Sequence, residues 1–381
     1  MPNKPTIIIA AIAASAYVRL AVEAGFNVIC MDAFADADTQ YLTPEWHQIS
    51  LVDGQLSATE VLNVLDGLAL RGIALSGIEG FCYGAGFEQQ PELLACVAER
   101  LPVLGNSAAC VQRSKHPQDF FEVCQALSIP HPRVQLTPPA QLDGWLVKQG
   151  GASGGAHVQW ASQHNTLMHA STYYQRFQSG QPVSCLFLAN RAGVQLLGFN
   201  EQWVSATEQA PFRLGGAVSH AELGDKVNAK LTAYVQALSA ALGLVGLNSC
   251  DAVWDGEQVW VLEINPRLSA SMRLYRLLQG HLMQAHVAAC KQPNALVNVM
   301  VDTACSHAHQ TLYATQTLQI PAHMEWPAWV SDIPSQGLQI DAGMPVITVS
   351  AGAASAEQAK AILTERVAAM NNTLATMEFN Q

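Results

Sequence analysis

Short apolar runs alternate with amphipathic stretches over the first 105 residues. A compact apolar run predicts a buried strand, and apolar residues spaced three and four apart predict a helix face. The expected order is strand Thr6–Ala11, helix Ser15–Ala24, strand Val28–Asp32, helix Ala58–Leu70, strand Ile73–Ile78, helix Pro91–Arg100 and strand Pro102–Gly105. Strands that alternate with helices form a parallel, doubly wound sheet, so residues 1–105 are predicted to be an α/β domain.

The pattern becomes α+β after residue 105. Two helices, Ala108–Arg113 and Pro117–Leu127, are expected first. The elements expected next are strands Tyr173–Phe177, Val183–Ala189, Val194–Asn200 and Trp203–Glu208, helix Asp225–Leu242, strands Leu247–Trp254 and Val259–Arg267, helical segments within Ala270–Cys290, strands around Thr311–Ile320 and Val346–Ala351, and helix Ser355–Met370. We predict three parts: residues 1–105, residues 106–295 with a small lid over about 135–180, and a small α+β unit over 296–381. This division suits a chain of 381 residues.

The turn after the first predicted strand contains no glycine, since its sequence is AIAASAY. A dinucleotide-binding turn needs glycines for close approach to pyrophosphate, so this domain is not expected to bind NAD in the usual way. We expect Asp32, at the end of the second strand, to cap the strand end or to contact a substrate.

A candidate metal site lies on the strand from Val259 to Arg267. Strand side chains alternate between two faces, which places Val259, Val261, Glu263 and Asn265 on one face. Pro266 ends the ladder because it has no N–H, and it leaves Arg267 at the strand end. A carboxylate and an amide oxygen at a strand end suit Mg²⁺, which prefers oxygen ligands. The alternative is an ordinary half-buried hairpin with charged residues at its rim.

Asp251, on the preceding strand, joins this site only in some registers. A two-residue turn at Asp255-Gly256 would pair Trp254 with Glu257 and would put Asp251 on the face opposite Glu263. A longer loop or a bulge would bring Asp251 to the same face. The metal hypothesis therefore requires the longer loop or the bulge.

A second candidate site is the segment WLVKQGGASGGAHVQW, residues 145–160. An apolar strand carries Lys148, and a loop with four glycines follows. Glycines let backbone N–H groups approach phosphate oxygens, and a lysine at the strand end supplies a positive charge. Such a loop alone is a weak signal. The chain has only seven lysines, however, and one within an apolar strand needs a partner.

Composition narrows the classes of function. The net charge of -11 argues against a nucleic-acid partner, which would need a basic face. The nine cysteines lie singly without a C-x-x-C motif, which indicates reduced thiols and a cytoplasmic protein. No apolar run approaches the length of about 20 residues that spans a bilayer, so no membrane contact is expected. His307 and His309 are expected at the surface, and a homodimer is the default assembly.

Taken in order, these motifs resemble the ATP-grasp superfamily: Lys148 and its glycine-rich loop, the linker strand from Tyr173, Asp251, and the run Glu263-Ile264-Asn265-Pro266-Arg267. The likeness covers nearly the whole chain and implies an ATP-grasp fold with a Rossmann-like N-terminal domain. It is closest to the branch of predicted ATP-dependent carboligases related to biotin carboxylase. The segments GNSAACVQRSK (105–115), DIPSQG (332–337) and GMPVITVSAGA (343–353) also resemble that branch.

The resemblance assigns roles to named residues. Lys115 and Lys148 would contact the phosphates of ATP, and the loop with Gly151, Ser153, Gly154 and Gly155 would cover them. The backbone of Arg176, Phe177 and Gln178 would meet the adenine edge, with Gln175 where many relatives carry a glutamate. Asp251, Glu263 and Asn265 would hold one or two Mg²⁺, a site that Mn²⁺ could also fill. Arg267, together with Arg213, would neutralise an acyl phosphate.

The function that the resemblance implies is ATP-dependent ligation of a carboxylate to an amine through an acyl phosphate, on a small metabolite. A glutamyl-type ligase in the biosynthesis of a one-carbon cofactor, such as methanofuran or a methanopterin-like pterin, is one substrate hypothesis. Two alternatives stay open. One is a carboxylase-like carboligase that uses carboxyphosphate, and the other is a catalytically silent ATP-binding regulatory protein.

Overall fold

A parallel four-stranded sheet forms the N-terminal part, as the alternating pattern predicted. The computed structural model describes residues 4–163, 171–295 and 297–378. The strand order is β3-β2-β1-β6, and all pairs are parallel. The elements are β1 (Thr6–Ala11), α1 (Ser15–Glu23), β2 (Asn27–Asp32), α2 (Ala37–Leu42), β3 (Glu45–Gln48), β4 (Leu51–Val52), β5 (Gln55–Leu56), α3 (Ala58–Leu70), η1 (Leu75–Gly77), β6 (Gly80–Tyr83) and α4 (Pro91–Ala98). Ile7 and Ile9 pack against α1, whereas Ile8 packs on the side of α3 and α4.

Two expected strands of this domain were wrong. Residues 73–78 contain a short 3-10 turn and are mostly accessible, and the buried strand is the next apolar run, β6. Residues 102–105 contribute a single bridge, from Val103 to Phe81, instead of a strand. Edge strand β3 was not predicted, because its residues alternate between partly and fully exposed and carry no apolar run.

A small antiparallel sheet follows in the region expected to be a lid, and it is called the lid sheet below. Its strand order is β7-β10-β8-β9, and Thr172 of β10 lies opposite Gln149 of β8. The elements of this region are α5 (Ala108–Lys115), α6 (Pro117–Ala126), β7 (Val134–Gln135), β8 (Trp145–Gln149), β9 (Gln159–Trp160), η2 (Ala161–Gln163) and β10 (Thr172–Arg176).

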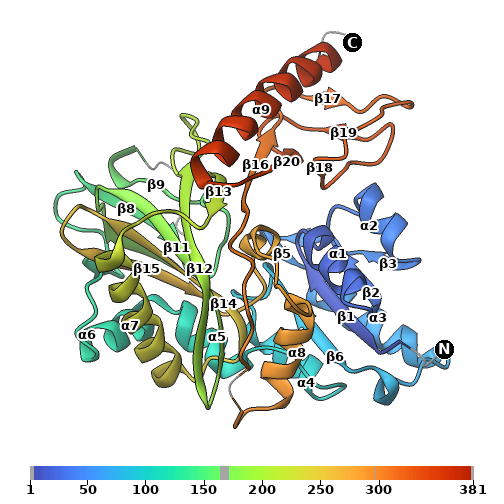
Figure 1. The fold of residues 1–381 in the computed structure, drawn as a ribbon, viewed down its shortest axis with the longest axis horizontal. Coiled ribbons are helices and arrows are strands. Elements are labelled where there is room, and N and C mark those ends of the chain that lie inside the picture. Colours follow the sequence, from blue (N-terminus) through green and yellow to red (C-terminus); the bar gives the residue numbers. More distant parts are fainter. Residues whose placement is uncertain (1–3, 164–170, 296, 379–381) are drawn as a thin grey trace.

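An eight-stranded sheet in the order β15-β14-β11-β12-β13-β16-β20-β18 is the largest layer (Figure 1). Its central elements are β11 (Gln181–Asn190), β12 (Gly193–Val204), β13 (Leu214–Ser219), α7 (Asp225–Leu242), β14 (Gly246–Trp254), β15 (Val259–Asn265), η3 (Ala270–Leu274) and α8 (Leu282–Lys291). The strand expected over 194–200 and the first two residues of the one expected over 203–208 form the single strand β12, and residues 205–208 lie outside any strand. Asn200 explains the error, because this polar residue is buried in the sheet, where it donates to Ser184 and accepts from Tyr275.

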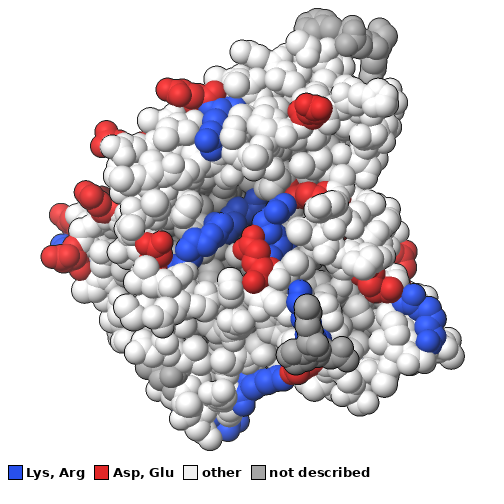
Figure 2. All heavy atoms as spheres, turned by 45° about the vertical axis from the view of Figure 1, so that its right-hand side comes forward, with Lys and Arg blue, Asp and Glu red and all other residues white. Residues whose placement is uncertain are grey.

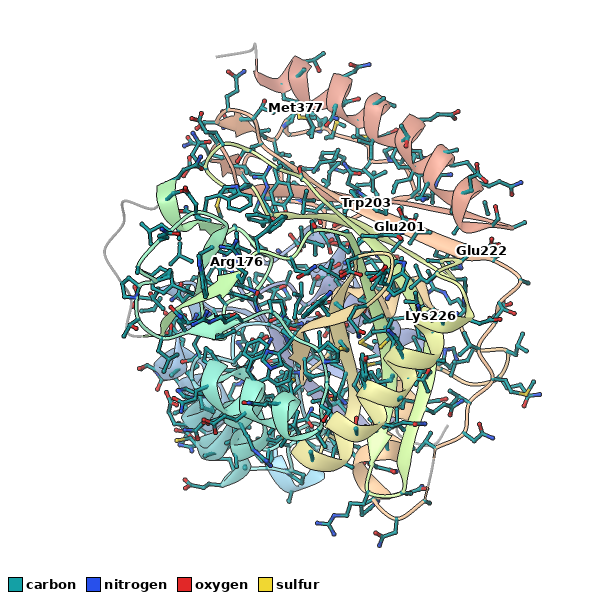
Figure 3. The ribbon with its side chains drawn as sticks, turned by 90° about the vertical axis from the view of Figure 1, so that its left-hand side faces the viewer. Arg176, Glu201, Trp203, Glu222, Lys226 and Met377 are labelled. Carbon is teal, nitrogen blue, oxygen red and sulfur yellow. The ribbon has the colours of Figure 1, made fainter. Side chains whose placement is uncertain are left out.

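The C-terminal strands extend this same sheet. The last elements are β16 (Ser306–Tyr313), β17 (Leu318–Gln319), β18 (Val330–Ser331), β19 (Gln339–Ile340), β20 (Pro345–Ala353) and α9 (Ala356–Glu378). Strand β16 pairs with β13, so one continuous sheet crosses the boundary expected at residue 296. Helix α9 lies over β16 and β20, and Lys360 of α9 pairs with Glu201 of β12 at 2.7 Å. Figure 3 shows Glu201 and Trp203 beneath this helix.

Charge is sparse on the surface, in keeping with a charged fraction of 13%. On the face in Figure 2, most atoms are uncharged, and lysine and arginine side chains gather around a hollow with a few acidic neighbours. All nine cysteines are free thiols. Within the described ranges, no helix has both the length and the apolar character needed to span a bilayer. His309 corrects an expectation, because it is buried on β16 instead of lying at the surface.

Candidate active site

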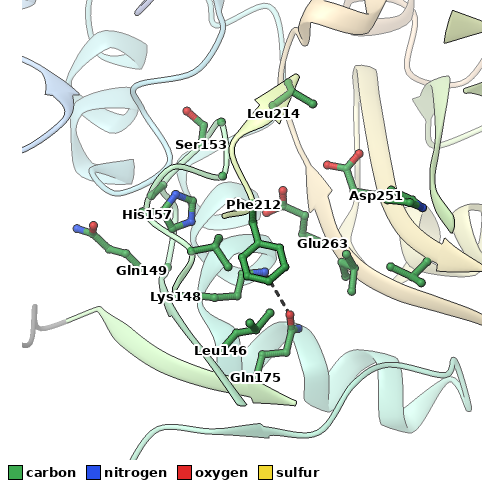
Figure 4. Close-up of a pocket in the computed structure, with 18 of the residues that line it drawn as sticks. Leu146, Lys148, Gln149, Ser153, His157, Gln175, Phe212, Leu214, Asp251 and Glu263 are labelled. Carbon is green, nitrogen blue, oxygen red and sulfur yellow. Dashed lines mark hydrogen bonds between the residues drawn. The ribbon is translucent and has the colours of Figure 1, made fainter. Parts of the chain in front are cut away.

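A cavity of about 420 Å³ lies between the lid sheet and the large sheet. Strands β8 and β10 and the glycine-rich loop form one wall, and β14 and β15 form the other (Figure 4). Phe212 and Leu214, just before and at the start of β13, lie between the two walls. The cavity therefore brings together the two stretches that the sequence indicated as candidate sites.

A β-bulge places Asp251 beside Glu263. The loop between β14 and β15 has four residues, so that Trp254 pairs with Val259 and Ala252 pairs with Val261. The register then shifts, and Asp251 lies directly opposite Glu263. Residues opposite each other in a ladder share a face. The condition that the metal hypothesis set for Asp251 is therefore met, through the bulge and not through either turn considered from the sequence.

The bulge also corrects the expected faces of β15. Val261 was expected on the face of Glu263, but it packs in one core cluster with Ile264. Leu262 and Glu263 line the cavity as neighbours. A strict period of two fails here because the extra residue of a bulge reverses the alternation.

Lys115 bridges the two oxygen-bearing side chains of β15. From the end of α5, its ammonium donates to Glu263 Oε2 at 2.9 Å and to Asn265 Oδ1 at 2.8 Å. The amide nitrogen of Asn265 donates to Asp251 Oδ2 at 2.8 Å, and Gln202 donates to Asp251 Oδ1 at 3.1 Å. Both carboxylates and the amide thus form one network.

The two carboxylates have different pKa values. Desolvation, followed by the charge of Glu263, raises the pKa of Asp251 to about 6. Desolvation acts in the same direction on Glu263, but the charges of Lys115 and Lys148 outweigh it and lower the pKa of Glu263 to about 2. The negative charge on Asp251 is therefore less stable than the one on Glu263, and a bound cation would stabilise it.

Lys148 points into the cavity from β8. Its ammonium donates to Gln175 Oε1 at 3.2 Å and lies 5.8 Å from the ring centre of Tyr173 (Figure 4). Burial acts to lower the pKa of Lys148, but Tyr173 and Glu263 raise it overall, so the lysine is charged. The amide nitrogen of Gln175 is buried and has no hydrogen-bond partner within the described residues, which leaves a donor for a ligand.

The glycine-rich loop is packed between other segments. Gly151 and Gly155 have φ values of +74° and +73°, a conformation that L residues rarely adopt. A Cβ at Gly151 would meet the backbone of Glu88 at 2.9 Å, and one at Gly155 would meet the carbonyl oxygen of Phe212 at 2.2 Å. The carbonyl of Gly154 accepts from Leu214 N–H at 2.9 Å. Glycine is thus required for close packing, and Ser153 of the same loop lines the cavity.

Two aromatic rings, Phe177 and Phe212, line the other end of the cavity. Trp160 packs against both, and the three ring centres lie 4.9 to 6.0 Å apart. The N–H groups of Arg176 and Phe177 already donate to the carbonyls of Arg133 and Gly144. A base bound here would stack on the rings and would meet the remaining backbone groups of residues 176–178.

The two candidate arginines lie outside the walls of the cavity. Arg267 is buried in an ion pair with Glu88, and its Nη2 lies 3.4 Å from Asn265 Oδ1, so it borders the network. Arg213 stacks on the ring of Tyr313 at 3.7 Å and donates to the carbonyls of Ser205 and Gly343. A catalytic role for Arg213 would require its guanidinium to leave this stack.

Sequence reasoning missed several residues of the site. His157, directly after the glycine-rich loop, lines the cavity, and desolvation and the charge of Lys148 lower its pKa to about 4. Gln202, Glu88 and Phe212 were also missed. Only His157 had a usable signal, its position next to the loop, because the others reach the site through pairings between distant segments.

Comparison with known proteins matches the middle of the chain to a domain family. Residues 119–271 match the model of the ATP-grasp domain family. The fold is similar to pyruvate carboxylase from Rhizobium etli, with a TM-score of 0.71 and 14% identity, over 95% of this chain but only 37% of that one.

Two further structures match over most of both chains. The biotin carboxylase domain of 2-oxoglutarate carboxylase from Hydrogenobacter thermophilus, in complex with MgADP, ADP and bicarbonate, has a TM-score of 0.68 and 10% identity, over 92% of this chain and 87% of that one. The L-amino acid ligase from Bacillus licheniformis has a TM-score of 0.70 and 12% identity, over 95% and 97%. Residues 119–271 thus match an ATP-grasp domain, and the chain has the ATP-grasp fold.

Proposed function

We propose that this protein is an ATP-dependent ligase that joins a small carboxylate to an amine through an acyl phosphate. The observation that carries the proposal is the arrangement of Asp251 and Glu263 opposite Lys115 and Lys148 in one cavity, next to the glycine-rich loop. Such a site can hold a triphosphate and the charge that develops during its transfer. The L-amino acid ligase with the same fold supports the choice of substrates.

In the proposed reaction, the protein acts mainly by positioning and charge neutralisation. Lys115, Lys148 and the loop amides hold the phosphates, so that a substrate carboxylate can attack the γ-phosphorus in line. One carboxylate oxygen bonds to phosphorus as the bond to the β-phosphate oxygen breaks, which releases ADP. The amine then attacks the acyl carbon and releases phosphate. The loop excludes water, which would otherwise hydrolyse the acyl phosphate.

The residues present fit a magnesium ion. Asp251, Glu263 and Asn265 offer hard oxygen donors on one face, and the raised pKa of Asp251 shows a carboxylate in need of a positive neighbour. Across the described residues, no group of three His, Cys, Asp or Glu side chains is arranged to hold a metal ion, so a magnesium ion here would take its other ligands from Asn265, the phosphates and water. Bound Mg²⁺ would neutralise negative charge on the phosphates.

Two other functions are compatible with the same fold and cavity. A carboxylase-like reaction with bicarbonate is favoured by the fold that the chain shares with the Hydrogenobacter domain. A catalytically silent nucleotide-binding protein would keep the cavity without turnover. Glutamyl ligation in one-carbon cofactor biosynthesis is a narrower hypothesis, and no contact within the described part of the chain selects it.

The test is ADP release by the full chain with Mg²⁺ and ATP across a panel of amino acids, polyamines and pterin-like acids, with bicarbonate as a separate arm. We expect release that requires one acid and one amine together. Lys148→Ala should abolish it, because the variant loses the charge that faces the phosphates. Lys226→Ala, which removes an exposed lysine from α7 (Figure 3), is the matched control and should retain full activity.

The outcomes separate the alternatives. Release with bicarbonate alone would favour the carboxylase-like reaction. Tight nucleotide binding without release in any arm would contradict the ligase proposal and favour the regulatory one. Equal activity of Lys148→Ala and Lys226→Ala would contradict the proposed contact between Lys148 and the phosphates.

A further inference from the structure

A second cavity, also of about 420 Å³, lies between the N-terminal domain and the C-terminal strands. Helix α1 and η3 line one side, and β16, β18, β20 and α9 line the other. It shares no lining residue with the first cavity, between the lid sheet and the large sheet, which is called the nucleotide cavity from here on. A ligand bound there would be contacted from parts of the chain more than about 300 residues apart, and domain interfaces are common places for ligand sites.

The lining of this cavity is strongly basic. Four arginines, two histidines and three serines line it, and no aspartate or glutamate does. The basic residues are Arg19, Arg273, Arg276, Arg366, His307 and His309. Their concentration is notable in a chain with a net charge of -11 and only 12 arginines. A concave wall of one charge sign focuses the field and attracts ions of the opposite sign.

Two of the arginines have acidic partners behind the wall, and two do not. Arg273 pairs with Asp332 at 3.1 Å, and Arg19 pairs with Asp38 at 3.3 Å. Arg276 donates to the carbonyls of Arg273 and Tyr275. Arg366 donates to the carbonyl of Ser350 and lies 5.1 Å from the ring centre of Trp329.

The charges of these two arginines are therefore not neutralised. Within the described ranges, neither Arg276 nor Arg366 has a carboxylate partner within 4.0 Å. Each guanidinium has five N–H donors, and the contacts to carbonyls use only part of this capacity. Both side chains thus keep charge and donors for an anion.

Two buried polar atoms at the cavity also have no partner. His309 is 4% exposed, and its Nδ1 accepts or donates no hydrogen bond within the described residues. The Nε of Arg273 is likewise buried without a partner there. Buried polar groups are almost always paired in proteins, so these two atoms keep unused hydrogen-bonding capacity in the wall of the cavity. His307 and His309 point to the same face of β16, across from Ser350 and Gly352 of β20.

From this arrangement we infer that the second cavity binds a small anion with at least two negative charges, a phosphate monoester or a polycarboxylate. Arginines bind both classes through paired N–H donors, and serine hydroxyls and a histidine N–H add neutral donors. The site is separate from the nucleotide cavity and does not depend on the proposed ligase reaction. Its occupant would hold α1 and η3 against the C-terminal strands.

The experiment measures anion binding to the full chain by calorimetry, with a saturating non-hydrolysable ATP analogue and Mg²⁺ present to fill the nucleotide cavity. Inorganic phosphate and citrate are the two probes, and chloride at equal ionic strength is the blank. We expect saturable binding of one probe at one site per chain. Phosphate binding alone identifies the phosphate class, and citrate binding alone identifies the polycarboxylate class.

The decisive variant is Arg276→Gln combined with Arg366→Gln. It should weaken anion binding by about tenfold or more, because two charge-assisted contacts are lost. Arg191→Gln, which removes an exposed arginine from the turn between β11 and β12, should bind as the parent does. His309→Asn, which keeps an amide donor, should weaken binding less than His309→Ala.

Three results would overturn the inference: no saturable binding of either probe in the presence of the analogue, binding that appears only when the analogue is left out, or equal binding by the double variant and the parent. An unfolding midpoint and analogue affinity equal to those of the parent would show that the double variant is folded. If it is not folded, the single variant Arg276→Gln, at an exposed position, carries the same test.

Discussion

Asp251 is the residue whose charge state should be most visible in solution. Its pKa rises from 3.8 to about 6 on folding. As pH rises, the unfolded chain therefore releases this proton before the folded chain does. The free energy of unfolding falls between about pH 4 and pH 6, and the whole loss is present above that range. Asp251→Asn should remove this effect and should stabilise the Mg²⁺-free protein by about 1–3 kcal/mol near neutral pH.

Urea unfolding of parent and variant in the presence of a chelator checks this prediction. The gain in the free energy of unfolding should shrink as pH falls and should vanish below about pH 4, where both states are protonated. A gain that is constant with pH would assign the effect to packing instead of charge. Added Mg²⁺ should stabilise the parent more than the variant if Asp251 is a ligand.

Glu88 is a second residue with a large predicted effect. It is 3% exposed and neutralises buried Arg267, which lies just after β15. Its carboxylate also accepts the N–H of Gly86. Glu88→Ala leaves a buried arginine unpaired, which should lower the free energy of unfolding by about 3–5 kcal/mol.

The control for this change is Glu92→Ala, at an exposed position on α4, which should change stability by less than about 0.5 kcal/mol. Glu88→Gln preserves shape and removes charge. If this variant is as stable as the parent, the ion pair does not carry the effect.

These residues show which side chains of the site can be predicted from the sequence and which cannot. Lys148 and Glu263 were identifiable because a lysine in an apolar strand and a carboxylate at a strand end stand out locally. Glu88 was not, because its partner Arg267 is 179 positions away and nothing local marks either as half of a pair. Arg213 was assigned from the resemblance alone, and the glycines beside it allow close packing of strands: a Cβ at Gly216 would lie 2.2 Å from the carbonyl oxygen of His309.

At the scale of elements, the glycine-rich loop gives a matched pair of tests. Gly154 and Gly155 both have positive φ, +76° and +73°, so an alanine at either position is strained by about 1 kcal/mol. Only at Gly155 would the Cβ also meet backbone, the carbonyl oxygen of Phe212. Gly155→Ala should therefore displace the loop and weaken binding of an ATP analogue by about tenfold or more, whereas Gly154→Ala should have a much smaller effect.

Calorimetric affinities and unfolding curves for both variants provide the measurement. The comparison separates backbone strain, which the two share, from the close contact, which they do not. Equal affinities in the two variants would mean that the position of the loop does not matter for nucleotide binding.

Elements were predictable where the pattern was local and uniform. The buried run of β1 and the long amphipathic helix α7 follow from periodicity alone. The bulge in β15 does not follow from periodicity, because the sequence VWVLEIN is also compatible with a regular strand. Strand β12 was divided in two because its polar residues resemble a turn, and only the partners of Asn200 in neighbouring elements explain why the strand continues.

At the scale of the whole molecule, the order of strands in the large sheet could not be predicted from the sequence pattern. Strand β13 pairs with β16, which lies about ninety residues later, so the C-terminal strands extend the central sheet. Composition and periodicity indicated a small terminal unit correctly as α+β. They contain no information on which sheet edge its strands join, since the choice depends on non-local packing.

The same architecture predicts how a nucleotide changes stability. The nucleotide cavity is walled by the lid sheet on one side and by β14 and β15 on the other, so a bound nucleotide contacts both layers. A ligand that binds only the folded state stabilises it by about 2.7 kcal/mol at a concentration 100 times its dissociation constant. A non-hydrolysable ATP analogue with Mg²⁺ should therefore raise the unfolding midpoint in proportion to the logarithm of its concentration.

Hydrogen exchange locates this stabilisation, because backbone amides that open locally exchange faster than those that open only on global unfolding. Protection should increase most in β8, β10 and the loop between residues 150 and 155, and least in α3, which lies on the far side of the parallel sheet. Lys148→Ala should lose most of the shift, and Lys226→Ala should keep it. An equal shift in both variants, or protection confined to the N-terminal sheet, would place the nucleotide elsewhere in the molecule.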